Sequence, residues 1–194
     1  MHFVLASRNA HKLRELAGLM GPHELVALPP SVELPPETGG TFLANALGKA
    51  RVAAAAMGEP VLADDSGIAA RALGGAPGIH SARYAGEGAT DQENLAKLLR
   101  EVPADADTRV AYVCALVLVC PNGAELVVEE RCEGELSHSV RGAGGFGYDP
   151  AFVPLEGDGV RTIAELEPAE KDAISHRGRA ARALLERLSA ADGS

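Results

Sequence analysis

The apolar positions along this chain fall into two kinds of spacing. Short continuous runs, such as Phe3 to Ala6 and Val61 to Ala63, are typical of strands buried on both faces. Apolar residues three or four positions apart, such as Leu13, Leu16 and Leu19, are typical of helices. The pattern predicts strands over 3–6, 24–28, 61–63, 110–120 and 125–132, helices over 12–20, 42–57, 91–102 and 168–188, an irregular Gly-rich stretch over 73–83, and a frayed tail over 190–194.

Local signals mark several of these boundaries. Thr41 is a candidate N-cap for the Ala-rich helix that follows it, and Thr90 with Glu93 has the spacing of a capping box. The turn Pro121-Asn122-Gly123 is predicted to join two strands into a hairpin. Glycines make 142–148 a loop.

The order of strands and helices predicts a mixed α/β protein without the regular alternation of a pure βαβ succession. The chain has 194 residues, of which 46% are hydrophobic and 23% charged, as in ordinary folded domains. We therefore predict a single domain over 1–194, with two lobes at most.

Charge and targeting patterns narrow the class of protein. A formal net charge of −9 argues against nonspecific binding to nucleic acids or membrane surfaces. The spacing of the three cysteines matches no zinc site, so we interpret them as small buried apolar residues of a protein in a reducing compartment. The N-terminus has no signal-peptide pattern, and the longest apolar run, over 110–120, is about half of the ~20 residues that a membrane helix needs. We expect a cytoplasmic protein that binds neither nucleic acid nor membrane.

The turn between the first strand and the first helix is a candidate phosphate site. Free backbone N–H groups and the positive end of a helix dipole stabilise anions at such a turn. Ser7 and Asn9 add side-chain hydrogen bonds there, and Lys12 adds a positive charge. The alternative is an ordinary helix cap with solvated charges.

Acidic residues in two further segments are candidates for cation binding. Asp64 and Asp65 follow directly on the strand predicted over 61–63 and precede Ser66. Adjacent carboxylates near a core repel each other and resist desolvation, and a bound cation offsets that cost. Mg²⁺ is typically bound by protein carboxylates together with the phosphates of a substrate. For the two aspartates, the alternative is an Asp-Gly-type turn. The second segment carries Glu37, which lies before the helix predicted over 42–57, and its alternative is a solvated carboxylate.

A glycine loop over 142–150 carries aromatic candidates. It contains G-x-G-x-x-G, but a proline follows and no helix opens there, so it does not fit a dinucleotide site. We interpret it as a loop that presents Phe146, Tyr148 and Asp149 to a stacking base. The alternative is a turn whose aromatic residue is anchored in the core.

Donor side chains gather in the helical region after 168. Lys171 and Ser175 are four positions apart on the predicted helix, so they share a face with the turn that bears His176 and Arg177. The alternative is a solvated helix face.

Taken together, these segments resemble the inosine triphosphate pyrophosphatase family, also called the dITP/XTP or non-standard purine NTP pyrophosphatases. The matching stretches occur in the family's order and span nearly the whole chain: SRNAHKLRE (7–15), ETGGTF (37–42), ADDSG (63–67), LGGAPGIHSARYAG (73–86), GGFGYDP (144–150) and AEKDAISHRGRA (169–180).

The resemblance implies an elongated α/β fold with a mixed central sheet flanked by helices, and two lobes with an active-site cleft between them. It also implies a homodimer with Mg²⁺ as cofactor. The implied reaction hydrolyses a purine nucleoside triphosphate (ITP, dITP or XTP) to the monophosphate and pyrophosphate, which cleanses the nucleotide pool.

The resemblance also implies roles for particular residues. Asp65 is the catalytic base and binds the metal together with Glu37, and Asp64 lies beside them. The substrate-binding residues are Ser7, Arg8, Asn9, Ala10, His11 and Lys12 for the triphosphate, Ser66 beside the metal ligands, and Phe146, Gly147, Tyr148, Asp149, Lys171, His176 and Arg177 for the base.

One position departs from the family's pattern. The family commonly has an acidic residue before the asparagine that follows ETG-x-TF, and Ala44 stands there in this chain. The departure predicts weaker Mg²⁺ affinity. Two alternative functions remain open: a pyrophosphatase for pyrimidine or other modified triphosphates, and a nucleotide-binding regulator with weakened catalysis.

Overall fold

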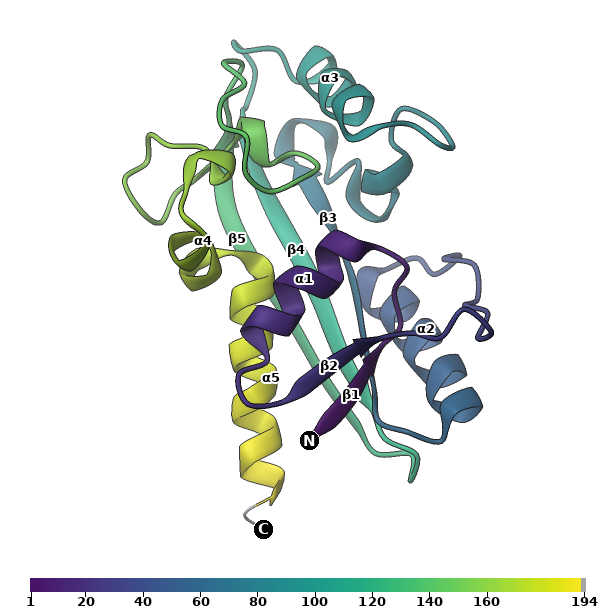
Figure 1. Cartoon of the computed structure of the whole chain (residues 1–194). Coiled ribbons are helices and arrows are strands. Elements are labelled where there is room, and N and C mark those ends of the chain that lie inside the picture. Colours follow the sequence, from purple (N-terminus) through teal and green to yellow (C-terminus); the bar gives the residue numbers. More distant parts are fainter. Residues whose placement is uncertain (193–194) are drawn as a thin grey trace. The chain divides into compact units, whose positions relative to one another are not determined.

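The computed structural model describes residues 1–192, and it confirms a mixed α/β fold (Figure 1). Six strands form one sheet in the order β2-β1-β3-β4-β5-β6. The strands are β1 His2–Leu5, β2 Glu24–Ala27, β3 Val61–Ala70, β4 Arg109–Val119, β5 Glu125–Leu136 and β6 Phe152–Pro154. The helices are α1 Ala10–Leu19, α2 Phe42–Met57, α3 Asp91–Glu101, α4 Pro168–Ile174 and α5 His176–Asp192, with 3₁₀ turns at Arg71–Leu73, Gly78–Arg83, Asp149–Ala151 and Ile163–Glu165.

The chain divides into two compact units. Unit 1 comprises residues 1–65, 114–130 and 177 onward, and unit 2 comprises 66–113 and 131–176. The chain therefore passes from one unit to the other within β3, β4 and β5 and at the start of α5.

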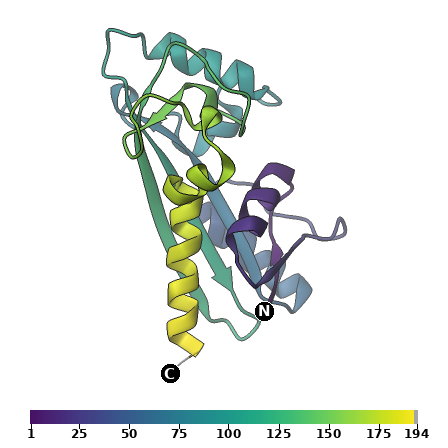
Figure 2. The same ribbon diagram turned by 60° about the vertical axis from the view of Figure 1, so that its left-hand side comes forward.

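Unit 1 has a core on both faces of its part of the sheet. β1 pairs in parallel with β2 and with β3, and Leu5 lies opposite Leu62. Side chains alternate along a strand, so Leu5 and Leu62 pack with α1 and α5, whereas Val4 and Ala63 pack against the alanines of α2. Figures 1 and 2 show α5 running along the hairpin of β4 and β5. Burial on both faces explains why these strands read as continuous apolar runs.

Unit 2 has its own core, built on the other ends of the same strands. Ile68 of β3 and Tyr112 of β4 pack with Leu98 of α3 and Phe152 of β6. The capping box at the start of α3 is confirmed, because the Thr90 hydroxyl accepts a hydrogen bond from the Glu93 amide and the Glu93 carboxylate accepts one from the Thr90 amide. In the part of the chain that the structure describes, no helix is long and apolar enough to cross a membrane.

β3 runs to Ala70, well beyond the strand predicted over 61–63. The prediction stopped at the aspartates because charged residues are rare in buried strands. Gly67 allows the extension, since a Cβ there would collide with the Ser81 hydroxyl and the carbonyl of Gly78. The Ser81 hydroxyl instead accepts a hydrogen bond from the backbone N–H of Ile68.

The largely helical region predicted over 168–188 is confirmed as α4 and α5, with a break at Ser175, whose backbone is extended. The tail predicted as frayed over 190–194 is helical to Asp192, and residues 193–194 lie outside the described residues. β6 was not predicted, because three residues are too few to show a period.

Candidate active site

Asp64 and Asp65 lie in the middle of β3 rather than in a turn at its end. Successive side chains of a strand point to opposite faces, so Asp64 shares the face of Leu62, and Asp65 shares the face of Ala63. The interpretation of the two carboxylates as one adjacent pair is therefore corrected. Different side chains hold each carboxylate, although the charges of Lys12 and Lys49 act on both.

Asp64 lies between cationic side chains from opposite ends of the chain. Its side chain is fully buried, with Oδ1 at 3.1 Å from the Lys12 ammonium of α1 and Oδ2 at 3.3 Å from Nε of Arg177 in α5. Arg177 also donates to the carboxylate of Glu15 at 3.0 Å. Burial alone would raise the pKa of Asp64, but the charges of Lys12, Arg177 and Lys49 outweigh it and hold that pKa well below its usual range.

Asp65 is held on the other face by Asn45 of α2. The Asn45 amide donates to Oδ2 of Asp65 at 2.9 Å, and its carbonyl oxygen accepts from the backbone N–H of Gly39 at 2.8 Å. Burial and the charge of Glu37 raise the pKa of Asp65, against the lowering effects of Lys49 and Asn45. A buried carboxylate with a raised pKa is a good candidate for a general base near neutral pH.

Glu37 joins the same unit through Lys49. The Lys49 ammonium is 2.5 Å from Oε1 of Glu37 and donates to the backbone carbonyl of Asp64 at 2.8 Å. Lys49 thus ties the loop that carries Glu37 to the strand that carries both aspartates. The acids Glu37 and Asp65 are the residues of unit 1 best suited to a hard divalent cation.

Asn45 and Lys49 were missed as site residues by the sequence analysis. They are four positions apart on α2, and both are buried in a helix whose other buried residues are alanines. Two large polar residues at helical spacing among small apolar ones were the available signal.

We expect Asn45→Ala to reduce about tenfold any turnover that depends on the Asp65 carboxylate. The substitution removes the hydrogen bond that fixes Asp65 and leaves the Gly39 amide without its acceptor. Asn45→Asp is the matched variant, because it keeps an acceptor for Gly39 but places a carboxylate against Asp65. Steady-state rates should rank the aspartate variant below the alanine variant, and the reverse order would contradict this account of Asn45.

The structure places the predicted phosphate segment at the start of α1. Asn9 is the N-cap, and its side chain accepts from the amides of His11 and Lys12. Ser7 accepts from the Asn9 amide at 3.1 Å. Arg8 has a structural contact that the prediction did not include, since its guanidinium donates to the carbonyls of Leu28, Pro29, Pro30 and Val32. Ala10 opens the helix, and His11 contacts Arg14.

The predicted base-pocket residues of unit 2 form a second cluster. Lys171 donates to Oδ2 of Asp149 at 2.8 Å, and the same oxygen accepts from the backbone N–H of Phe146 at 3.0 Å. The Lys171 ammonium also lies 5.6 Å from the centre of the Phe146 ring. The structure thus brings the glycine loop and α4 together, as the sequence analysis expected.

Other members of the predicted pocket have separate anchors. The Tyr148 hydroxyl donates to the carbonyl of Ser81 at 2.7 Å, and the Gly147 amide donates to Asp91 at 2.8 Å. His176 is buried and belongs to unit 2, while Arg177 belongs to unit 1. Ser66, half-buried on β3, is the first residue of unit 2.

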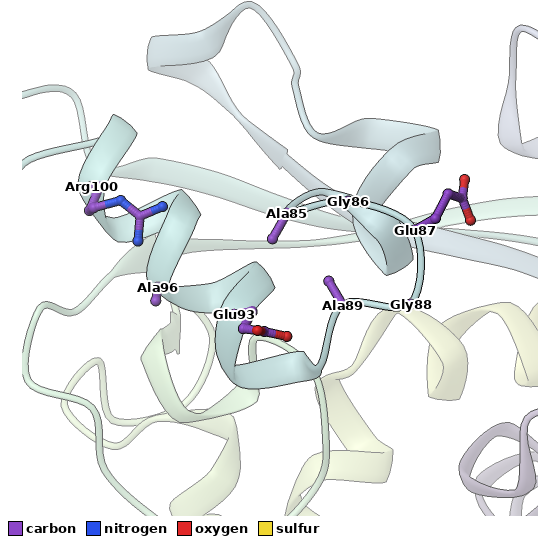
Figure 3. Close-up of a pocket in the computed structure, with 8 residues that line it drawn as sticks. All are labelled: Ala85, Gly86, Glu87, Gly88, Ala89, Glu93, Ala96 and Arg100. Atoms are coloured by element: carbon purple, nitrogen blue, oxygen red, sulfur yellow. The ribbon is translucent and has the colours of Figure 1, made fainter.

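Unit 2 contains a cavity of about 390 Å³. Figure 3 shows the residues that line it. The cavity is lined by loop 85–89 and by Glu93, Ala96 and Arg100, which lie along α3. None of the predicted site residues lines this cavity, so it is distinct from the two clusters described above.

The fold of this chain matches the folds of α/β proteins whose structures have been solved. A HAM1 protein from Coxiella burnetii matches with a TM-score of 0.87 and 42% sequence identity, over 97% of this chain and 98% of that one. The sequence model of the Ham1 family matches residues 3–187, so this chain belongs to the Ham1 family.

Curated relatives cover nearly the whole chain as well. The dITP/XTP pyrophosphatase of Thermosynechococcus vestitus is 50% identical over 187 residues, which is 94% of this chain and 93% of that protein. The dITP/XTP pyrophosphatase of Streptomyces coelicolor is 48% identical over 190 residues, which is 94% of each chain. These matches confirm the resemblance seen in the sequence motifs.

Proposed function

We propose that this protein is a nucleoside-triphosphate pyrophosphatase that hydrolyses the non-standard purine nucleotides dITP, ITP and XTP to the monophosphate and pyrophosphate. The observation that carries the proposal is the buried carboxylate of Asp65, fixed by Asn45 beside the acid Glu37. The relatives named above are dITP/XTP pyrophosphatases at 48–50% identity, which supports the same reaction for this chain.

Mg²⁺ is part of the proposal, and its fit can be judged from the donor set. Among residues 1–192 there is no group of three or more His, Cys, Asp or Glu side chains placed to hold a metal ion. Mg²⁺ usually keeps several waters and takes one or two carboxylates together with substrate phosphates. Glu37 and Asp65 fit that pattern, so they would hold a Mg²⁺ ion that is completed by the triphosphate. When bound, the ion neutralises charge that develops on the leaving pyrophosphate.

Asp65 acts in this reaction on the attacking water. Its carboxylate orients or deprotonates the water that attacks the α-phosphorus, and pyrophosphate leaves. The Asn45 amide and the Lys49 contacts fix the groups around it, so much of the catalysis comes from positioning and charge stabilisation. We assign the N-terminus of α1, with Ser7 and Asn9, to the polyphosphate.

Base selectivity follows from donors and acceptors. Hypoxanthine and xanthine carry a 6-oxo acceptor, whereas adenine carries a 6-amino donor. Lysine and arginine side chains only donate hydrogen bonds, so Lys171 would leave adenine unpaired. A pocket built to bind a polar group can reject the mismatched analogue by ~10⁴–10⁵.

The homodimer and the cytoplasmic location stay predictions within this proposal. The regulator alternative rests on Ala44, which is exposed on the first turn of α2, where its amide is hydrogen-bonded to the Thr41 hydroxyl. An acidic residue is absent from that turn. Because Glu37 and Asp65 are present, we expect catalysis with a raised Mg²⁺ requirement.

A pyrophosphate-release screen with and without Mg²⁺ tests the function. The panel contains dITP, ITP, XTP, the four common ribonucleotides and dTTP. We expect release from the first three to exceed release from ATP by at least a hundredfold, and to depend on Mg²⁺. A preference for dTTP or UTP would favour the pyrimidine alternative, and nucleotide binding without release would favour the regulator.

A further inference from the structure

Tyr112 connects three parts of unit 2 that the proposed base pocket needs. It lies on the central strand β4 and is 7% exposed. Its hydroxyl donates to Oδ1 of Asp149 at 2.9 Å. Its ring stacks on the imidazole of His176, with centroids 4.6 Å apart and planes 10° from parallel. One side chain, Tyr112, therefore contacts both Asp149 and His176 of the proposed pocket.

The two carboxylate oxygens of Asp149 accept hydrogen bonds from different partners. Oδ1 accepts from Tyr112, while Oδ2 accepts from the Lys171 ammonium at 2.8 Å and from the Phe146 amide at 3.0 Å. A carboxylate held at both oxygens cannot rotate, so the position of Lys171 depends on Tyr112. The ring of Phe152 packs against Tyr112 as well, with centroids 4.6 Å apart, and restricts it further.

We propose that Tyr112 is a positioning residue that sets the preference for 6-oxo purines, by holding Asp149 with Lys171 on one side and His176 on the other in a fixed arrangement. This inference rests on the proposed function, because it assigns Lys171 and His176 to the base. Tyr112 acts through its neighbours and need not touch the substrate.

Selectivity for 6-oxo over 6-amino purines requires hydrogen-bond donors that are held in fixed positions. A lysine that can shift by about 1 Å can move away from the 6-amino group of adenine, so adenine binds with only a small loss of affinity. A lysine locked in place cannot move away. Loosening the anchor should therefore harm discrimination more than it harms turnover of the preferred substrate. A merely structural role for Tyr112 would lower the rates for both substrates together.

Tyr112→Phe removes the hydroxyl and keeps the ring stacked on His176. We expect the ratio of kcat/KM for ITP over ATP to fall about tenfold, the usual scale for a hydrogen bond to a charged group. The rise in KM for ITP should exceed any fall in kcat. The ratio of Kd for AMP over IMP, measured by calorimetry, should fall in parallel and does not depend on hydrolysis.

Tyr84→Phe is the matched control. Its hydroxyl also donates to a carboxylate in unit 2, that of Glu101, and neither residue belongs to the proposed site. We expect this variant to leave both ratios unchanged. Thermal unfolding of both variants checks that the fold is retained.

A double-mutant cycle with Asp149→Ala tests whether Tyr112 acts through Asp149, because alanine removes the oxygen that accepts from the Tyr112 hydroxyl. In the Asp149→Ala background, the further change Tyr112→Phe should alter the ITP-over-ATP ratio by less than twofold. A further tenfold loss in the double variant would overturn the proposed link.

The outcomes separate the two proposals. A wild-type protein that prefers ITP and IMP, but whose preference survives Tyr112→Phe within twofold, contradicts the role of Tyr112 and leaves the proposed function intact. A wild-type protein without preference in either measurement overturns the proposed function, and the role of Tyr112 with it.

Discussion

Replacing Asp65 with asparagine is expected to lower kcat for dITP about 10³-fold. The amide keeps the size of the side chain but can neither take a proton from water nor supply a full negative charge to a cation. Asp65 is 5% exposed, and burial raises the pKa of its carboxyl, so its charge contributes little to the fold. Steady-state kinetics at saturating Mg²⁺, with thermal unfolding alongside, should show lost turnover at a nearly unchanged Tm.

The neighbouring substitution Asp64→Asn provides the contrast. It removes the carboxylate that Lys12 and Arg177 surround, so the expected result is a lowered Tm with a smaller loss of turnover. Near-wild-type turnover of Asp65→Asn would remove Asp65 from the role of base.

Arg177→Met is expected to destabilise the protein by about 3 kcal/mol. It leaves the fully buried Asp64 with a smaller share of compensating charge, and breaking a buried ion pair from one side typically costs about 3–5 kcal/mol. Urea unfolding of the single and double variants measures the effect. The double variant Asp64→Asn/Arg177→Met should recover much of the loss, because no uncompensated carboxylate remains. Strictly additive losses would show that the two side chains do not act as a pair.

The same ion pairs predict a dependence of stability on pH. The cations hold the pKa of Asp64 in the folded protein below its unfolded value, which is about 3.9. Its contribution to the free energy of unfolding is therefore present above about pH 4 and is lost as the pH falls through the folded pKa. The acid-side loss of stability should be shallower in Asp64→Asn than in the wild-type protein. Equal slopes would contradict this account.

The sequence predicted features whose cause is local. Thr41 and Thr90 were identified as caps from the residues within one turn of them, and both cap as expected. The strand over 110–120 was recognised because burial on both faces makes a strand uniformly apolar.

What the sequence did not predict depends on contacts between distant residues. The length of β3 requires the cations that neutralise Asp64, and one of them, Arg177, lies 113 positions away. Asn45 reads as an ordinary helix residue until the strand that carries Asp65 is packed against it. Tyr112 reads as one more apolar position of a strand, and its polar end has a partner 37 positions later.

The alternation along β3 has a consequence for how this segment can change in evolution. A deletion of one residue shortly before Asp64 would turn every later side chain of the strand over. The carboxylate meant for Asn45 would then face α1 and α5, and its neighbour would face α2. Substitutions in this stretch can be tested one at a time, but insertions and deletions exchange two chemically different environments at once. We expect natural length variation among relatives to fall in the loops and to spare this strand.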